Sequence, residues 1–345
     1  MKPVSVFIRS LFAAASLILT AACTEKSDYA RIEGFAQGGT YAVTFRVPEG
    51  TDEEHIRLEI DSILARIDNS LSGYNKGSLL SRLNAGEDLP LDSVFIRCFK
   101  RSTEVWRESE GAFDPSAAPL FDIWGFGFEN GGSPTREQIA QAMQVVGMDK
   151  FSLEFRPDGM HLAKADSLAK LNFNAIAQGL SCDMIAEFLE SEKCHDYLID
   201  VGREMMCSGE RKGGGAWRIG IDKPVDNAGE EVNLQDIVDV SGKGIVTSGN
   251  YRKFYIKDGE KFAHTIDPRT GSPVKHTLLS ATVIAKDAAT ADAYATWFMV
   301  AGLEKASAIA SQRDDIEAYL VYGDQQEMKV WKSAGFRTEE KQLTK

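Results

Sequence analysis

The segment Ala281–Met299, which reads ATVIAKDAATADAYATWFM, constrains the fold of this chain most. It opens with a short apolar run that contains three β-branched residues, and such a run predicts a buried strand over 281–285. Asp287 suits a helix N-cap, and the residues that follow predict a helix over 288–299. Asp292 and Thr296 lie four residues apart, so both side-chain oxygens fall on one face of that helix. A carboxylate and a hydroxyl together suit a hard cation such as Mg²⁺, although such a pair more often belongs to a solvated helix face.

The overall charge limits the partners of the chain. Its 345 residues suffice for one large domain or two small ones, and the formal net charge is -12. This charge argues against nucleic acid and against an anionic membrane surface as partners. If the ligand is an anion, an acidic protein has to supply local positive potential through backbone amides, a divalent ion or a few placed Arg and Lys side chains.

The first residues are predicted to be a leader. Lys2 and Arg9 form a positive region, and 11–20 is an apolar stretch too short for a comfortable membrane span. Small residues then precede Cys23, as in a bacterial lipoprotein cleavage box. We therefore expect a lipoprotein signal peptide over 1–23, lipidation of Cys23, a tether over 24–31, and a protein anchored in the bacterial cell envelope that faces the periplasm. Ordinary signal cleavage nearby is the alternative.

The remaining cysteines show no metal-binding spacing. They stand at positions 98, 182, 194 and 207. An exported compartment would permit disulfides. Because Cys98 and Cys182 sit within apolar helical patterns, we expect buried free thiols.

The order of elements predicts an α+β fold. Many predicted strands alternate irregularly with helices and no βαβ repeat is visible, which indicates a mostly antiparallel sheet with flanking helices on one side. Local patterns predict a capping box from Thr51 to Glu54, a strand over 168–173, and a hairpin that pairs 254–256 with 262–266. The stretch 111–127, rich in glycine and aromatic residues, shows no helical period and is predicted to be a turn region.

Three further stretches carry polar groups that suit a phosphorylated ligand. Residues 172–179 read NFNAIAQG and are predicted to join a strand to a helix N-terminus, where phosphates bind well. Residues 244–252 read GIVTSGNYR, and the hydroxyl of Ser248 with the guanidinium of Arg252 can meet phosphate oxygens. Residues 264–271 read HTIDPRTG. His264 has the pKa range of a general base, although a lone histidine on a strand is more often structural.

Together with ADAYAT at 291–296, these stretches resemble the ApbE family, the FAD:protein FMN transferases. The resemblance covers nearly the whole chain after the leader and implies one T-fold-like domain over 32–345. It implies a Mg²⁺ ion held by the Ala175 carbonyl, Asp292 and Thr296, with His264 as the catalytic base. The residues that it places against FAD are Gly38, Tyr74, Ala112, Phe113, Asp114, Asn172, Gln178, Ser248, Arg252 and Ile266.

The chain departs from the family pattern at four positions. Gly38 stands where the family has Met, and Asn172 stands where it has Asp. Gln178 replaces a Lys, so it can donate hydrogen bonds but supplies no charge. Arg203 replaces a Gly, and its guanidinium could meet a phosphate or pair with a neighbour such as Glu204.

The expected function is therefore Mg²⁺-dependent transfer of FMN from FAD to a Thr or Ser hydroxyl of an exported acceptor protein, with release of AMP. Two alternatives stay open. In one, water replaces the protein hydroxyl and the chain is an FAD pyrophosphatase that gives FMN and AMP. In the other, which Gly38, Asn172 and Gln178 favour, it is a non-catalytic FAD-binding lipoprotein.

Overall fold

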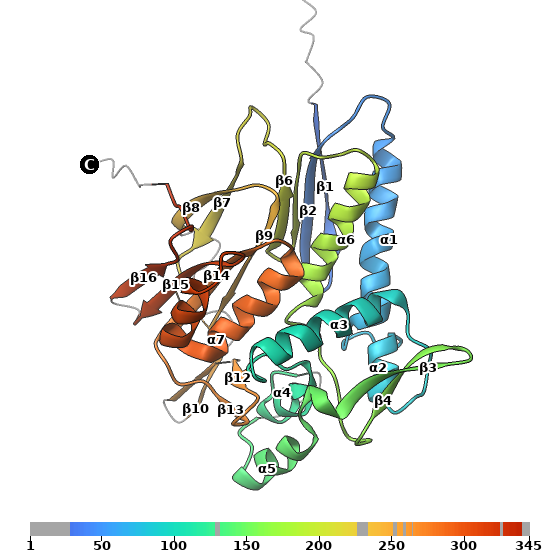
Figure 1. Cartoon of the computed structure of the whole chain (residues 1–345), viewed down its shortest axis with the longest axis vertical. Helices are drawn as coiled ribbons and strands as arrows, with labels where there is room; N and C mark the ends of the chain where they lie inside the picture. The colour runs from blue at the N-terminus through green and yellow to red at the C-terminus, as the bar shows by residue number, and fades with distance from the viewer. Residues whose placement is uncertain are drawn as a thin grey trace, which may run out of the picture.

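A large antiparallel sheet forms the centre of the molecule (Figure 1). The computed structural model describes residues 28–127, 132–225, 234–250, 254–257, 260–263, 265–324 and 327–339. Eight strands are ordered β1-β2-β5-β6-β9-β14-β15-β16, and each pairs antiparallel with its neighbours. Their bounds are Tyr29–Ala36, Gly39–Arg46, Tyr197–Val201, Glu204–Ser208, Lys243–Gly249, Leu278–Ala285, Glu317–Gly323 and Met328–Lys332. The predicted α+β class is thus confirmed.

Three long helices cover one face of this sheet. They are α1 (Glu53–Leu71), α6 (Ala177–Ser191) and α7 (Ala288–Ser311). On α1 the buried residues Ile56, Ile60 and Ile63 recur at helical spacing, and they pack with Val43 of β2 and Ile199 of β5. Figure 1 shows α1 and α6 side by side along the β1–β2 end of the sheet, while α7 lies beside β9 and β14.

The other face of the sheet is covered by the hairpin of β7 (Trp217–Asp222) and β8 (Leu234–Val240). Successive side chains of a strand point to opposite faces, and β14 shows the consequence. Val283 packs in the core cluster beneath α7, whereas its neighbour Ile284 packs with Trp217 of the hairpin. Because both faces are buried, β14 reads as a continuous apolar run rather than as an alternating one.

The remaining elements gather at one end of the molecule. They are α2 (Leu79–Asn84), α3 (Ser93–Glu108), α4 (Ala118–Trp124), α5 (Arg136–Val145) and the hairpin of β3 (Phe151–Arg156) with β4 (Gly159–Lys164). Two short pairs complete the fold: β10 (Phe254–Lys257) with β11 (Glu260–Ala263), and β12 (Ile266–Asp267) with β13 (Ser272–Pro273). Single 3-10 turns occupy Pro115–Ala117 and Met148–Lys150.

Several local predictions were wrong, each because a side chain or a nearby strand satisfies the backbone differently. Residues 168–173 form no strand, since the side-chain amide of Asn84 bonds both backbone groups of Leu171 and Asn172 N–H donates to the Pro115 carbonyl. Asp52, not Thr51, caps α1 and accepts from two backbone amides.

Two further local predictions need correction. The region 111–127 contains α4, because Asp114 caps the preceding turn and a proline occupies the first turn of α4. In the predicted 254–266 hairpin, the second strand ends at Ala263, and Ile266 pairs with Pro273 instead.

The structure confirms the prediction of buried free thiols. Cys98, Cys182, Cys194 and Cys207 are all buried and unpaired as disulfides. Cys23 lies outside the described residues. Within the described ranges, no helix is both long and apolar enough to cross a membrane.

Candidate active site

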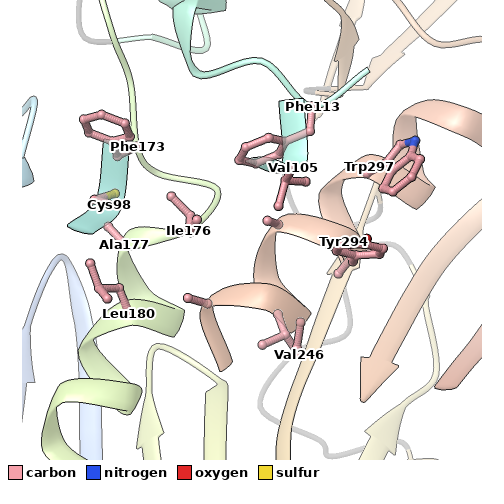
Figure 2. Close-up of a cluster of buried hydrophobic side chains, with 14 of the residues drawn as sticks. Cys98, Val105, Phe113, Phe173, Ile176, Ala177, Leu180, Val246, Tyr294 and Trp297 are labelled. Atoms are coloured by element: carbon pink, nitrogen blue, oxygen red, sulfur yellow. The ribbon is translucent and has the colours of Figure 1, made fainter. Parts of the chain in front are cut away.

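The N-terminal turns of α6 and α7 meet at the predicted cation site. Helix α6 begins at Ala177 after a turn in which the amides of Ile176 and Ala177 donate to the Phe173 carbonyl, at 3.1 and 2.9 Å. Helix α7 begins directly after β14, and Asp287 caps it by accepting from the amide of Thr290 at 2.7 Å. Apolar side chains from both helices and from α3 pack behind these turns, with Ile176, Leu180 and Tyr294 among them (Figure 2).

Asp292 is a buried carboxylate that forms no ion pair with any described basic residue. Its exposed fraction is 4%, and its Oδ2 accepts one hydrogen bond, from the amide of Gly179 at 3.2 Å. In the described part of the chain no Lys or Arg forms an ion pair with it. The pKa of Asp292 is raised to about 7, chiefly by burial and also by the charge of Asp183, against the lowering effect of the hydrogen bond from the Gly179 amide. A buried carboxylate with so little compensation is chemically suited to a cation.

Thr296, one turn after Asp292, and Ala175, on the turn before α6, are the predicted neutral oxygen ligands. Thr296 is the half-buried residue in an otherwise buried run of α7, and its Oγ1 lies 3.5 Å from the Oγ of Ser248 in β9. Gly179 is in the first turn of α6, where amides have no acceptor within the helix, and its amide donates to Asp292. Across the described ranges the Ala175 carbonyl accepts no hydrogen bond. The structure therefore brings Asp292, Thr296 and Ser248 together, and the Gly179 amide joins them to the first turn of α6, which follows Ala175 in the chain.

The donor set contains a single carboxylate. Within the residues placed by the structure, no group of three or more His, Cys, Asp or Glu side chains could hold a metal ion. A carboxylate, a hydroxyl and a carbonyl are hard oxygen ligands, which Mg²⁺ and Ca²⁺ accept and which soft metals do not prefer. The residues present thus fit a magnesium ion that takes its remaining ligands from water or from a bound phosphate.

Asp114 anchors a loop next to this region. Burial raises its pKa to about 6, against the lowering effect of hydrogen bonds from Ser116 and from Nε1 of Trp106, the latter at 3.1 Å. Ala112 and Phe113 are buried, and Figure 2 shows Phe113 beside Val105 of α3.

Asn172 joins this loop to the turn before α6. Its amide donates to the Pro115 carbonyl at 2.8 Å, and its Oδ1 accepts from the amide of Asn174 at 2.8 Å. Asn172 therefore uses its side chain to shape the turn that presents Ala175. An Asp at this position could accept the same bond.

The β1–β2 turn reaches the same end of α6. Gln37, next to Gly38, donates from Nε2 to the Ser181 hydroxyl at 2.6 Å. Gly38 has a φ of +77°, a conformation that glycine adopts without strain, and no atom lies within 4 Å of the position that a Cβ would take. The side chain of Gln178 points toward the turn between β5 and β6, because a Cβ on Gly202 in that turn would lie 2.0 Å from the Gln178 Nε2. Gly38 and Gln178 are therefore both placed at the N-terminal end of α6.

Tyr74 is exposed next to the turn that leads into α6. Its exposed fraction is 64%, and its hydroxyl lies 3.5 Å from Nδ2 of Asn174. An aromatic ring left open to solvent next to Ala175 is available to stack on a planar ligand.

Ile266 is as deeply buried as Ala112 and Phe113, with an exposed fraction of 2%, and it packs with Leu120 and Trp124. The neighbouring Thr265 donates to Oδ1 of Asn250 at 2.5 Å, which ties this segment to the end of β9. Arg252 and His264 lie outside the described residues.

Arg203 pairs with a residue other than the predicted neighbour. Its Nη2 lies 2.9 Å from Oδ2 of Asp222 in β7, so its partner is Asp222 rather than Glu204. The φ of Arg203 is +87°, which is unusual for a residue with a side chain. The family has glycine at this position.

A cavity of about 330 Å³ adjoins Tyr74 through Gly73. It lies between α2, α4 and the 168–171 segment, and four of its five charged side chains pair with one another: Arg82 with Glu87 at 2.6 Å and Lys170 with Asp122 at 3.8 Å. These charges are already neutralised, so the phosphates of a ligand are better served by the helix N-termini.

Two residues important to this geometry were missed at the level of sequence. Gly179 lies in the first turn of α6, and Asp183 lies one turn later and accepts from the amides of Ala288 and Ala289. A glycine inside a helical pattern indicates close packing, but it does not show which residue packs against it.

Comparison with known proteins identifies the class. The model of the ApbE family matches residues 38–320. The FAD:protein FMN transferase of Vibrio cholerae is 30% identical over 333 residues, which covers 95% of this chain and 97% of the relative. That of Haemophilus influenzae is 31% identical over 323 residues, 91% of this chain and 92% of the relative.

Solved structures agree with this result. The flavin transferase ApbE from Vibrio cholerae superposes with a TM-score of 0.79 at 29% identity, over 89% of this chain and 98% of that one. The apo flavinyl transferase ApbE of Pseudomonas stutzeri gives 0.78 at 31% identity, over 89% and 95%. The chain belongs to the ApbE family.

Gly179→Ala tests the close approach of the two helices. A Cβ at this position would lie 2.4 Å from the carbonyl oxygen of Ala288, a backbone atom that cannot rotate away. Helix propensity alone predicts that alanine stabilises by about 1 kcal/mol. We expect the steric effect to prevail, with a loss of about 2 kcal/mol in the free energy of unfolding measured by denaturant titration. The exposed Gly77→Ala is the control and is expected to change stability by less than about 0.5 kcal/mol.

Proposed function

We infer that this chain is an FAD:protein FMN transferase, which moves the FMN half of FAD to a hydroxyl of an acceptor protein and releases AMP. The observation that carries this inference is the buried carboxylate of Asp292, which forms no ion pair with a described residue and lies near Thr296 and Ser248 at the N-terminal turns of two helices. The curated relatives, which carry this activity in their names, support it. Helix N-termini favour the negative phosphates of such a substrate.

Magnesium is part of this proposal. Asp292, Thr296 and the carbonyl of Ala175 would hold the ion. When bound, it would neutralise the pyrophosphate and stabilise the charge that develops during transfer. Since the site offers one carboxylate, FAD phosphates would complete its charge, in keeping with the preference of Mg²⁺ for substrate phosphates.

The side chains of this protein would then align the reactants. The acceptor hydroxyl oxygen forms a bond to the FMN phosphorus, the bond from that phosphorus to the bridging oxygen breaks, and AMP leaves with that oxygen. The hydroxyl proton passes to His264, the one residue of the predicted site with a suitable unperturbed pKa. Tyr74, Gly38 and the Ala112–Asp114 loop are proposed to hold the isoalloxazine ring, and Ser248 and Arg252 to bind phosphate oxygens.

An assay with the purified mature chain, FAD, Mg²⁺ and an exported protein that offers a Thr or Ser acceptor tests the function. We expect an acceptor that stays yellow after denaturation and gains the mass of FMN, with AMP formed in equal amount. Free FMN with AMP and no labelled acceptor would indicate a pyrophosphatase. FAD that is bound and recovered unchanged would indicate a binding protein without activity.

We further propose that residues 1–23 are removed as a lipoprotein signal peptide and that lipidated Cys23 anchors the domain 32–345 through the 24–31 tether. The domain would then face exported acceptors in the periplasm. Mass spectrometry of the mature protein from cells should find a lipid-modified Cys23 as its first residue. An unmodified N-terminus at another position would contradict the anchor.

A further inference from the structure

Helices α6 and α7 each cap the other with a carboxylate. Asp183 of α6 accepts from the amides of Ala288 and Ala289 at 2.7 and 3.0 Å. In return, Asp292 of α7 accepts from the amide of Gly179 in the first turn of α6. Asp292 lies about one turn and Asp183 between one and two turns inside its own helix, and these hydrogen bonds join the N-terminal ends of the two helices.

Asp183 is not the residue that caps α7 locally. Asp287 already caps α7 through the amide of Thr290, as a residue just before a helix commonly does. Asp183 instead comes from another helix, and its side chain is buried with an exposed fraction of 6%. Among the described residues its hydrogen bonds go to the two α7 amides, and the neighbouring Arg97 pairs with Glu187. A buried carboxylate held by two helix amides fixes where that helix end lies.

Two glycines allow the start of α7 to pack closely against neighbouring backbone. A Cβ on Gly179 would lie 2.4 Å from the Ala288 carbonyl oxygen, and a Cβ on Gly244 of β9 would lie 2.5 Å from the Ala288 Cα. The first residue of α7 therefore touches the backbone of both α6 and β9. The hydrogen bonds from the Ala288 and Ala289 amides to Asp183 hold the start of α7 in this position.

We propose that Asp183 is a positioning residue that sets the separation between the Ala175 carbonyl, on the turn that leads into α6, and the Asp292 and Thr296 side chains of α7. This inference rests on the proposed function, since it assigns Asp183 to the geometry of the cation site. Asp183 itself does not touch the cation or FAD. Partners that orient metal ligands in this way commonly affect metal affinity about 10- to 100-fold.

The test is Asp183→Asn, which keeps the volume but places an amide N–H₂ group against one of the two backbone donors. Two Mg²⁺ midpoints are measured with FAD present: the concentration that gives half of the maximal thermal stabilisation, and the concentration that gives half of the maximal transfer rate. We expect both midpoints to rise roughly tenfold. At saturating Mg²⁺ the KM for FAD should stay within about twofold of wild type. Asp92→Asn is the matched control, because Asp92 caps α3 and bonds to Ser70 and the amide of Phe95. It should lower stability without changing either Mg²⁺ midpoint.

The possible outcomes separate this inference from the proposed function. A variant that is less stable but responds to Mg²⁺ as wild type does would show that Asp183 is only structural and would overturn the inference. A wild-type chain with no Mg²⁺ response and no transfer would instead overturn the proposed function.

If Asp183→Asn does not fold, hydrogen exchange on the wild-type chain decides. Mg²⁺ with FAD should slow exchange of the Gly179, Ala288 and Ala289 amides. Unchanged exchange there would overturn the inference.

Discussion

Replacing Asp292 with alanine is expected to abolish measurable FMN transfer, with a fall of about 10³-fold or more, equivalent to about 4 kcal/mol of transition-state stabilisation. The reason is that Asp292 supplies the single carboxylate of the proposed cation site, and Thr296 and Ala175 offer only neutral oxygens. Asp292→Asn should behave similarly, because the amide keeps an acceptor for Gly179 but loses the charge. Initial rates of acceptor labelling over a range of Mg²⁺ concentrations measure the effect.

The control for Asp292 is Asp236→Asn, which removes a carboxylate charge on β8 where the partner is the Tyr319 hydroxyl. It should leave both the rate and the Mg²⁺ dependence near wild type. Asp292 variants that still transfer FMN at wild-type rates, with unchanged Mg²⁺ dependence, would remove the cation site from the proposal.

Replacing His264 with alanine should slow transfer by about 10²- to 10⁴-fold, the usual contribution of a general base. FAD binding should persist, because the phosphates and the isoalloxazine ring are assigned to other residues. The two effects are measured separately, by the labelling rate at saturating FAD and by quenching of FAD fluorescence. A true base also predicts that the rate of the variant loses the dependence on a group titrating near neutral pH.

His276→Ala is a useful comparison for His264. His276 bonds the Met299 carbonyl at 2.8 Å, close to the kink of α7 at Gly302, and burial lowers its pKa. We expect this change to affect stability rather than the pH profile of transfer. Wild-type labelling rates in His264→Ala would strip His264 of the base role, and loss of FAD binding would reassign it to the substrate.

The strand–helix unit of β14 and α7 could be predicted from the sequence because its signals are local. An apolar run, a capping Asp287 and a row of helix formers lie within some twenty residues, and the structure has them in that order. The burial of Cys98 and Cys182 was predictable for the same reason, since both sit in apolar helical patterns.

Features that depend on distant residues could not be predicted in this way. The 168–173 segment has the composition of a strand, but the amide of Asn84, 87 residues away from Leu171, takes its hydrogen bonds. The link from Asp183 to Ala288 joins residues 105 apart, and nothing near Asp183 in the sequence indicates it. Likewise, the apolar run of β14 shows that both of its faces are buried, but it does not reveal that the β7–β8 hairpin covers one of them.

The glycine contacts at the start of α7 also restrict how a dinucleotide enters. A Cβ on Gly179 or Gly244 would meet main-chain atoms of Ala288, which no side-chain rotation can move away, so we expect the start of α7 to keep its position. We therefore expect room for so large a substrate to come from exposed groups such as Tyr74, which is 64% exposed, rather than from the start of α7. Substrate admission and charge neutralisation would then depend on separate parts of the chain.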